Sequence, residues 1–319
     1  MLMLDGHRVD DLPTALPGGA VWIDLLDGTP EEISWVEQHS GFHIPDRAEL
    51  SEIESSSRLR TEANALYLTT PVVFRDGAGM SITSPLGFVL SKSRLITVRF
   101  EPLTAFKTFA AVWSKPDAQD RGSQTAFVGV MDAIVDRIAD VLEMVGSELD
   151  DVSHHVFSVH KGGPPAREDA NLRAILRQIG RCGDIASKIR DSLLGVARIV
   201  PYVLGQSAEA LPPALRLRLE TQRADISSLN DYNMHLTNKV QLLLDATLGL
   251  INIEQNNIIK VLTVVSVVGV PPTLVASMYG MNFHDMPELS WTWGYQYGLA
   301  LIVLSAVCPI IWFKLRGWL

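Results

Sequence analysis

The chain has 319 residues, of which 47% are hydrophobic and 20% charged, and its net charge is −9. This acidic balance excludes nucleic acid as an expected partner, because protein surfaces that bind nucleic acid are basic. The two cysteines, Cys182 and Cys308, are too few for a disulfide framework or a zinc-ligand cluster.

Residues 1–125 alternate between strand-like and helix-like runs, which predicts an α/β domain. Strands are expected at 20–26, 65–74, 87–90 and 94–100, and helices at 30–39 and 45–56. An export signal would need an apolar run near the N-terminus, but Asp5, Arg8, Asp10 and Asp11 stand there. We therefore expect this domain to lie in the cytoplasm.

The next segment, 126–213, carries two helical patterns. Apolar residues from Met131 to Val152 repeat at intervals of three and four, which is typical of a long helix that packs on other helices. The breaker run from Gly162 to Pro165 ends this helix, and a second apolar pattern extends from Leu172 to Val200. The two patterns predict an antiparallel helical hairpin.

A third helical stretch begins after Pro212-Pro213 and meets no further proline until Pro271. A single helix over 214–278 would be roughly 100 Å long, at about 1.5 Å per residue. Because this length far exceeds the thickness of one bilayer, we expect a cytoplasmic stalk that continues into a first transmembrane helix.

Charged residues disappear from two stretches, Val261 to Met278 and Tyr295 to Phe313. Each stretch is close to the length of about 20 apolar residues that crosses a bilayer. We therefore expect a periplasmic loop over 279–294 and a second transmembrane helix, with the C-terminus, over 295–319. The alternative is a pair of buried core helices.

Positive charge indicates the orientation of these spans. Lys260 precedes the first span, Lys314 and Arg316 follow the second, and the loop between them has neither Lys nor Arg. Positive residues favour the cytoplasmic side. Both termini are therefore expected in the cytoplasm, with the chain in a bacterial inner membrane.

Polar residues follow the long helix into its apolar part, and we call them the polar stripe. They are Asp245, Asn252, Asn256, Thr263, Ser266, Thr273 and Ser277, at spacings of 7, 4, 7, 3, 7 and 4 residues. This rhythm keeps them on one helix face. Polar groups in lipid need partners or water, so the stripe is predicted to face an aqueous path that several identical subunits enclose.

Two apolar residues, Ile259 and Val270, share this face and could form constrictions that close by dewetting. The residues of the polar stripe that follow Asp245 in the chain carry neutral oxygens. These suit Mg²⁺, which prefers oxygen ligands and gives up its water reluctantly. Pro271 and Pro272 would free further backbone carbonyl oxygens. The alternative is that Ser and Thr bond to their own helix while Asn joins neighbouring helices. The unbroken register favours the aqueous path.

The sequence Tyr279-Gly280-Met281-Asn282-Phe283, at the end of the first of two C-terminal spans, resembles the CorA family of magnesium and cobalt transporters. Similarity to the proteobacterial members continues at 253–256, at 271–277 and at Trp318-Leu319. The resemblance implies an α+β membrane protein that forms a funnel-shaped homopentamer, with the long helix lining the pore. It implies a selectivity motif of Gly280, Met281 and Asn282 at the periplasmic mouth, where Gly280 would allow a sharp turn. It also places Asn256, Thr273 and Asp245 on the pore wall.

The resemblance further implies that intracellular Mg²⁺ closes the pore by joining carboxylates of neighbouring subunits. Glu52 matches one of these positions, although Ser51 stands where relatives often have a second acid. For its partner, Asp225 and Glu220 are the candidates. No cofactor is expected beyond Mg²⁺ as the transported and regulatory ion.

The expected function is therefore Mg²⁺ influx, with Co²⁺ and Ni²⁺ as further ions. A zinc transporter of the same superfamily is one alternative, although the polar stripe has no Cys or His to favour a softer ion. A membrane-tethered enzyme or sensor is the other. Against an enzyme, the sequence has no Walker loop, nucleophile elbow, zincin helix or dinucleotide fingerprint.

Overall fold

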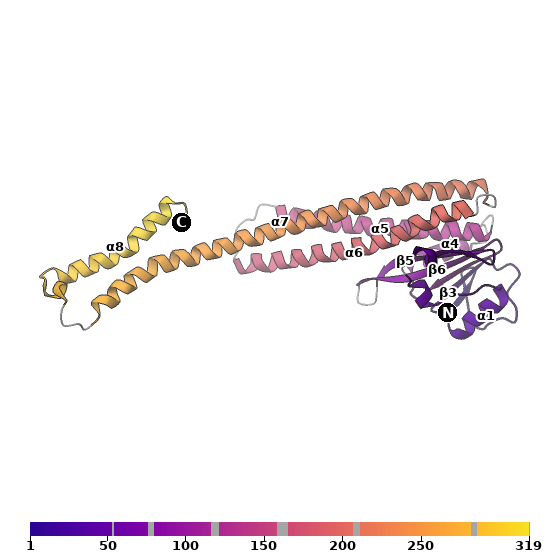
Figure 1. Ribbon diagram of the computed structural model, residues 1–319, viewed down its shortest axis with the longest axis horizontal. Helices are drawn as coiled ribbons and strands as arrows, with labels where there is room; N and C mark the ends of the chain where they lie inside the picture. The colour runs from indigo at the N-terminus through magenta and orange to yellow at the C-terminus, as the bar shows by residue number, and fades with distance from the viewer. Residues whose placement is uncertain are drawn as a thin grey trace. The chain divides into compact units, whose positions relative to one another are not determined.

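The structure is a computed structural model, and it describes residues 1–319 except 53, 76–79, 116–120, 158–164, 207–210, 282–285 and 319. The chain divides into two compact units, each drawn in Figure 1. Unit 1 comprises residues 1–163 and 173–244, and unit 2 comprises residues 164–172 and 245–319. Each unit is described by itself.

Unit 1 contains a seven-stranded sheet with the order β2-β1-β3-β7-β6-β5-β4. The strands are β1 (Leu2–Leu4), β2 (His7–Val9), β3 (Trp22–Leu26), β4 (Leu59–Glu62), β5 (Ala65–Arg75), β6 (Ser81–Ser91) and β7 (Leu95–Arg99). Only β3 and β7 pair in parallel, while the other neighbours pair antiparallel. The predicted strands are all present, and β6 begins six residues before the predicted run.

One face of the sheet is covered by α1 (Pro30–Ser40) and α2 (Arg47–Leu50), with α3 (Ser55–Arg58) following in the chain. Their core contains Ile23 and Val89 from the sheet and Val36 and Leu50 from the helices. The single helix predicted over 45–56 is wrong. Asp46 begins α2 with a capping box, and the helix ends after one turn at Ser51, so the segment forms two short helices.

The opposite face is covered by α4 (Thr104–Trp113), α5 (Ser123–Phe157) and α6 (Pro165–Gln206), which gives three layers. The rings of Trp22 and Phe109 meet edge to face at 4.9 Å, and those of Phe88 and Phe127 at 5.6 Å. At Gly195 on α6, a Cβ atom would lie 2.1 Å from the Thr70 hydroxyl oxygen. Glycine therefore lets α6 approach β5 closely.

Three helices of unit 1, α5, α6 and the first part of α7 (Pro213–Tyr279), lie side by side in Figure 1. Residues 134–141 of α5 share a pocket with Ile189 of α6, while further along α5 Glu148 contacts Cys182. The two helices therefore run in opposite directions, as the two arms of a helical hairpin do. Lys239 on α7 forms an ion pair with Asp150 on α5.

A buried ion pair joins the two parallel strands at the centre of the sheet. Arg99 Nη2 donates to Asp24 Oδ2 at 2.8 Å, Arg99 Nε lies 3.1 Å from Oδ1, and Thr97 Oγ1 donates to Oδ1 at 2.7 Å. Both charged side chains are less than a tenth exposed. Fork-shaped pairing and the added hydrogen bond satisfy the two charges without water.

We expect Asp24→Ala to lower the free energy of unfolding by about 3–5 kcal/mol, because it leaves the Arg99 guanidinium buried without its partner. Denaturant unfolding of the purified chain measures this loss. Asp140→Ala is the matched control, since the Arg137–Asp140 pair is long, at 3.7 Å, and exposed. Its loss should be below about 1 kcal/mol. Equal losses in the two variants would contradict this account of the core.

Unit 2 contains the first residues of α6 up to Leu172, the remainder of α7 from Asp245 onward, the short 3₁₀ helix η1 (Pro287–Ser290) and α8 (Gly294–Leu315). In Figure 1, α8 runs back opposite to the last part of α7. The two charge-free stretches of the sequence thus form a pair of helices, as predicted.

Candidate functional site

The polar stripe lies wholly on the unit 2 part of α7, where its side chains are open. Each of them is exposed except Thr263, which is half-buried. The two apolar residues of the same face are equally open, with Ile259 59% and Val270 62% exposed. The chain alone therefore does not cover this face.

The helix geometry explains why these residues share one face. An α-helix has about 3.6 residues per turn, so alternating steps of three and four return to the same side. From Asn252 to Ser277 the steps alternate without a gap once Ile259 and Val270 are included. The α7 helix is continuous through this whole segment. The same register reaches Gly249 at one end and Gly280 at the other.

Two hydroxyl groups of the stripe bond to their own helix. Thr263 Oγ1 donates to the Ile259 carbonyl oxygen at 2.8 Å, and Thr273 Oγ1 donates to that of Gly269 at 2.8 Å. Such bonds are what we expect under the alternative in which Ser and Thr bond to their own helix and Asn joins neighbouring helices. The bonding has a second consequence. A hydroxyl whose hydrogen is already donated in a hydrogen bond has only acceptor lone pairs left for other partners. These oxygens can accept hydrogen bonds from water.

Two prolines interrupt the backbone hydrogen bonds of α7 without ending the helix. Pro271 and Pro272 have no N–H, so the carbonyl oxygens of Val267 and Val268 lose their usual helix donors. The helix nevertheless continues to Tyr279. The span therefore carries additional carbonyl acceptors, as the sequence predicts.

The segment with the selectivity motif begins where α7 ends. The Gly280 N–H donates to the Ala276 carbonyl oxygen at 3.0 Å, and its φ lies outside the left-handed region. A Cβ at Gly280 would stand 3.2 Å from that same oxygen. Gly280 thus provides room at the helix end rather than the sharp turn that we expected. Met281 is exposed, and Asn282 lies outside the described residues.

The apolar faces of both predicted spans are also exposed. The most apolar stretch of α7 is 0% buried within the chain, and that of α8 is 6% buried. Buried core helices, the alternative raised by the sequence, would have most of this surface covered within the chain. An exposed apolar surface of this extent needs lipid or other protein to cover it. The two helices therefore have the character of membrane spans.

Aromatic residues at both ends of α8 were missed by our sequence analysis. Trp291, Trp293, Tyr295 and Tyr297 are exposed near its start. At the other end of α8, the Arg316 guanidinium lies 5.6 Å from the ring centre of Trp312. The rings of Phe313 and Trp318 stack with their centres 5.5 Å apart. Tryptophan and tyrosine favour the two membrane–water interfaces. The 22 residues of α8 extend about 33 Å, close to the ~30 Å of a hydrocarbon core.

The two candidate regulatory carboxylates lie on different elements of unit 1. Glu52 is exposed between α2 and α3, where its carbonyl oxygen accepts from Arg58 Nε at 2.8 Å. Asp225 is exposed on α7, and together with Asp132 and Asp140 it adds to the effect of burial in raising the pKa of Asp136. No contact found among the described residues joins Glu52 to Asp225.

Metal-ligating side chains do not gather within one copy of the chain, as far as its described residues extend. Over the part that the structure describes, no three His, Cys, Asp or Glu residues are arranged to hold a metal ion. The role of Glu52 and Asp225 thus stays a prediction about neighbouring subunits.

Known proteins resemble this chain over nearly its full length. The family described as CorA-like Mg²⁺ transporter protein matches residues 17–315. The magnesium transport protein CorA of Escherichia coli (strain K12) is 32% identical over 300 residues, which cover 94% of this chain and 92% of that protein. Its namesake in Sodalis glossinidius is 31% identical over 319 residues, covering 99% and 98%.

Solved structures share the fold. The CorA magnesium transporter from Methanocaldococcus jannaschii superposes with a TM-score of 0.75 at 19% identity, over 93% of this chain and 91% of that one. The full-length CmaX protein superposes with a TM-score of 0.66 at 17% identity, over 99% and 96%. The arrangement of an α/β domain, long helices and two C-terminal apolar helices is therefore a known one.

Proposed function

This chain belongs to the family of CorA-like Mg²⁺ transporter proteins, and from that premise we propose that it carries Mg²⁺ into the cell through a pore lined by the polar stripe. The observation that supports this most is the polar face that continues through Val261–Met278, a stretch of α7 that is otherwise apolar and largely exposed. Such a face is costly in lipid and favourable in water.

The lining oxygens suit an ion that keeps its hydration shell. Waters bound to Mg²⁺ point their hydrogens outward, so they need acceptors around them. Thr263 and Thr273 offer only acceptor lone pairs after bonding to their own helix. The amides of Asn252 and Asn256 offer carbonyl oxygens. Neutral acceptors hold the hydrated ion weakly, which allows it to leave again.

The pore closes, in this proposal, at Ile259 and Val270. Rings of exposed apolar side chains on the lining face hold no water when they approach one another, and a dry constriction stops a hydrated ion. Ions enter at the periplasmic mouth, where Gly280, Met281 and Asn282 form the selectivity motif. Both termini lie in the cytoplasm, consistent with the positions of Lys260, Lys314 and Arg316 around the spans.

Flux through the purified chain in liposomes tests this function. Mg²⁺ should enter under an inward membrane potential, and Co²⁺ and Ni²⁺ should follow because their hydrated ions are of similar size. Zn²⁺ flux without Mg²⁺ flux would favour the zinc transporter. No flux of any divalent ion by an assembled protein would favour the tethered sensor.

We expect the chain to assemble as a symmetric homo-oligomer, and as a homopentamer on the family resemblance. One polar face per chain must be buried against copies of itself to enclose a path. Native mass spectrometry of the detergent-solubilised protein measures the subunit number. A monomer or dimer that transports Mg²⁺ would contradict the proposed pore.

Intracellular Mg²⁺ regulates the pore, we propose, by joining Glu52 to an acid such as Asp225 on the next subunit. The bound ion would neutralise repulsion between the carboxylates and favour the closed assembly. A ligand shifts such an equilibrium only through its different affinities for the two states. Removing one of its ligands should therefore weaken closure.

For Glu52→Ala we expect the internal Mg²⁺ concentration that halves the current to rise roughly fivefold, near the lower end of typical allosteric couplings. Ser51 provides no second carboxylate, which keeps the effect small. Current recorded against internal Mg²⁺ measures the shift. Glu54→Ala, two residues along the same exposed segment, is the control and should match the wild type. Coincident curves for Glu52→Ala and wild type would remove Glu52 from the mechanism.

A further inference from the structure

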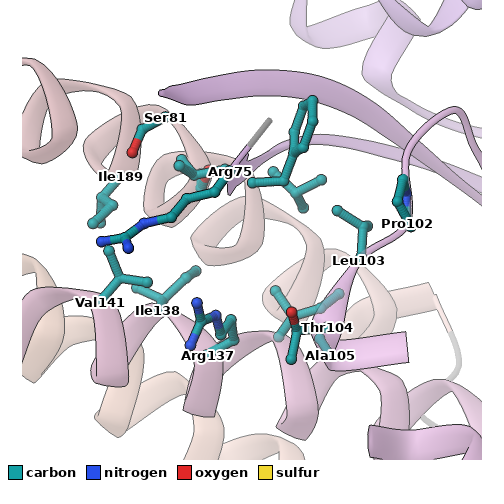
Figure 2. Close-up of a pocket in the computed structure, with 15 residues that line it drawn as sticks. Arg75, Ser81, Pro102, Leu103, Thr104, Ala105, Arg137, Ile138, Val141 and Ile189 are labelled. Carbon is teal, nitrogen blue, oxygen red and sulfur yellow. The ribbon is translucent and has the colours of Figure 1, made fainter. Parts of the chain in front are cut away.

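A pocket in unit 1, outside the polar stripe, lies between the sheet and the helices that cover it (Figure 2). Its volume is about 820 Å³ with its opening to solvent included. Its lining residues are Val72, Val73, Phe74, Arg75, Ser81, Pro102, Leu103, Thr104, Ala105, Ile134, Arg137, Ile138, Val141, Ile189 and Ser192.

One wall of the pocket is apolar. Ile134, Ile138 and Val141 recur along one face of α5, and Ile189 stands opposite on α6. Val72 and Phe74 of β5 line the same space. An apolar wall of this kind suits the hydrocarbon part of a ligand rather than a bare ion.

Two guanidinium groups line the same pocket from different elements. Figure 2 shows the Arg75 side chain extending from the end of β5 toward Val141, and that of Arg137 standing on α5 near Ile138. Arg75 Nη2 donates to the Met144 sulfur at 2.7 Å, and a thioether is a weak acceptor. With respect to the described residues, Arg75 therefore keeps most of its hydrogen-bonding capacity.

The second guanidinium is also available. Arg137 Nη1 lies 3.7 Å from Asp140 Oδ2, and both side chains are exposed, at 42% and 67%. Such a pair is weak in water. None of the described residues that line the pocket is acidic. The local charge of the lining is thus positive, although the whole chain is acidic.

The start of α4 adds a third favourable contribution. Thr104 and Ala105, its first two residues, line the pocket, and Leu103 before them has no side-chain group to cap their N–H groups. Uncapped N–H groups at a helix start attract negative charge.

We propose that this pocket binds a small organic phosphate monoester, with the phosphate between Arg75 and Arg137 and the hydrocarbon part along the isoleucine wall. A phosphate monoester carries a charge of about −1.5 to −2 near neutral pH and has three acceptor oxygens, so it can pair with two guanidiniums at once. A carboxylate has one charge and two oxygens and satisfies this arrangement less well. The ligand joins the end of β5 to α5.

Phenyl phosphate is the probe for this site, because it combines the phosphate with a small apolar ring. Saturation-transfer NMR of the full chain in nanodiscs of zwitterionic lipid, with empty nanodiscs as background, measures its binding. We expect saturable binding that weakens with salt, and about tenfold weaker binding of inorganic phosphate and of phenylacetate. Absence of saturable binding, or equal binding of phenylacetate, would overturn the assignment.

Arg75→Gln and Arg137→Gln should each weaken phenyl phosphate binding about tenfold or more, since each removes a charge-assisted hydrogen bond. Arg177→Gln, an exposed arginine of α6 outside the pocket, is the matched control and should bind like the wild type. Thermal unfolding midpoints check that all three variants are folded. Wild-type affinity in both pocket variants would contradict the proposal.

Discussion

Mg²⁺ uptake by the Asn282→Ala variant is expected to fall about tenfold or more, with the oligomer intact. The change removes one amide acceptor from each subunit at the proposed mouth of the pore. Hydrogen bonds to the waters of a divalent ion are charge-assisted, and loss of one such bond changes an equilibrium by about that factor. Because α7 ends at Tyr279, the change leaves the packing of the helix untouched.

Asn257→Ala is the control for this experiment. It makes the same substitution on α7. Asn257 is one residue away from Asn256, so its side chain points away from the polar face, and it is exposed as well. Uptake into cells or liposomes, normalised to the amount of assembled protein, compares the two variants. If Asn282→Ala assembles and takes up Mg²⁺ at the wild-type rate, Asn282 has no role in selectivity.

A larger loss is expected from Thr273→Lys, which places an ammonium group on the proposed pore face. Two unit charges about 4 Å apart repel by ~4 kcal/mol at the effective dielectric near a protein surface, and Mg²⁺ carries twice the charge. Flux should fall more than about 100-fold, to the background of empty liposomes. Native mass spectrometry establishes that the variant still assembles.

Thr273→Ser is the matched variant, because it keeps a hydroxyl that can donate to the Gly269 carbonyl oxygen, as Thr273 does. We expect it to retain most of the wild-type flux. An assembled Thr273→Lys protein that conducts Mg²⁺ normally would show that this residue faces lipid or protein rather than the ion.

Long helices were predictable from the sequence because their apolar spacing is local. The patterns over 131–152, 172–200 and 214–278 fall inside α5, α6 and α7, with the helix ends within a few residues of the breakers. The sheet was predicted only in part. Its central strands are apolar runs, whereas β1 and β2 have three residues each, too few for a periodic signal.

The hairpin between β1 and β2 nevertheless had a signal that we did not use. Asp5 and Gly6 form its turn with φ of 47° and 85°, and Asp-Gly is a favoured pair for such turns. The Asp5 carboxylate also accepts from the Trp22 N–H at 2.9 Å. In contrast, Ala63 and Asn64 make the turn before β5 with positive φ, and Ala-Asn gives a much weaker signal.

That the polar residues share one side of α7 was predictable, because a helix fixes which residues share a side. What this side meets was not predictable, since the spacing of Asn256 and Thr273 is the same whether they face water, lipid or a neighbouring helix. The pairing of Glu52 with Asp225 is harder still. They are far apart in sequence, lie on different elements, and in this proposal meet only between subunits.

The proposed pore requires that, between Val261 and Met278, the polar face of α7 meets water while its other faces do not, and cysteine modification tests this most directly. In a chain with Cys182 and Cys308 replaced by alanine, single cysteines are placed at Ser266 and Thr273 on the face, and at Val265 and Val268 off it. A cationic thiosulfonate reagent reacts with the thiolate, which forms only where water reaches it. We predict loss of Mg²⁺ flux after modification at Ser266 and Thr273 and none at Val265 and Val268. Unchanged flux in the first pair, or equal loss in both pairs, would contradict the proposed pore.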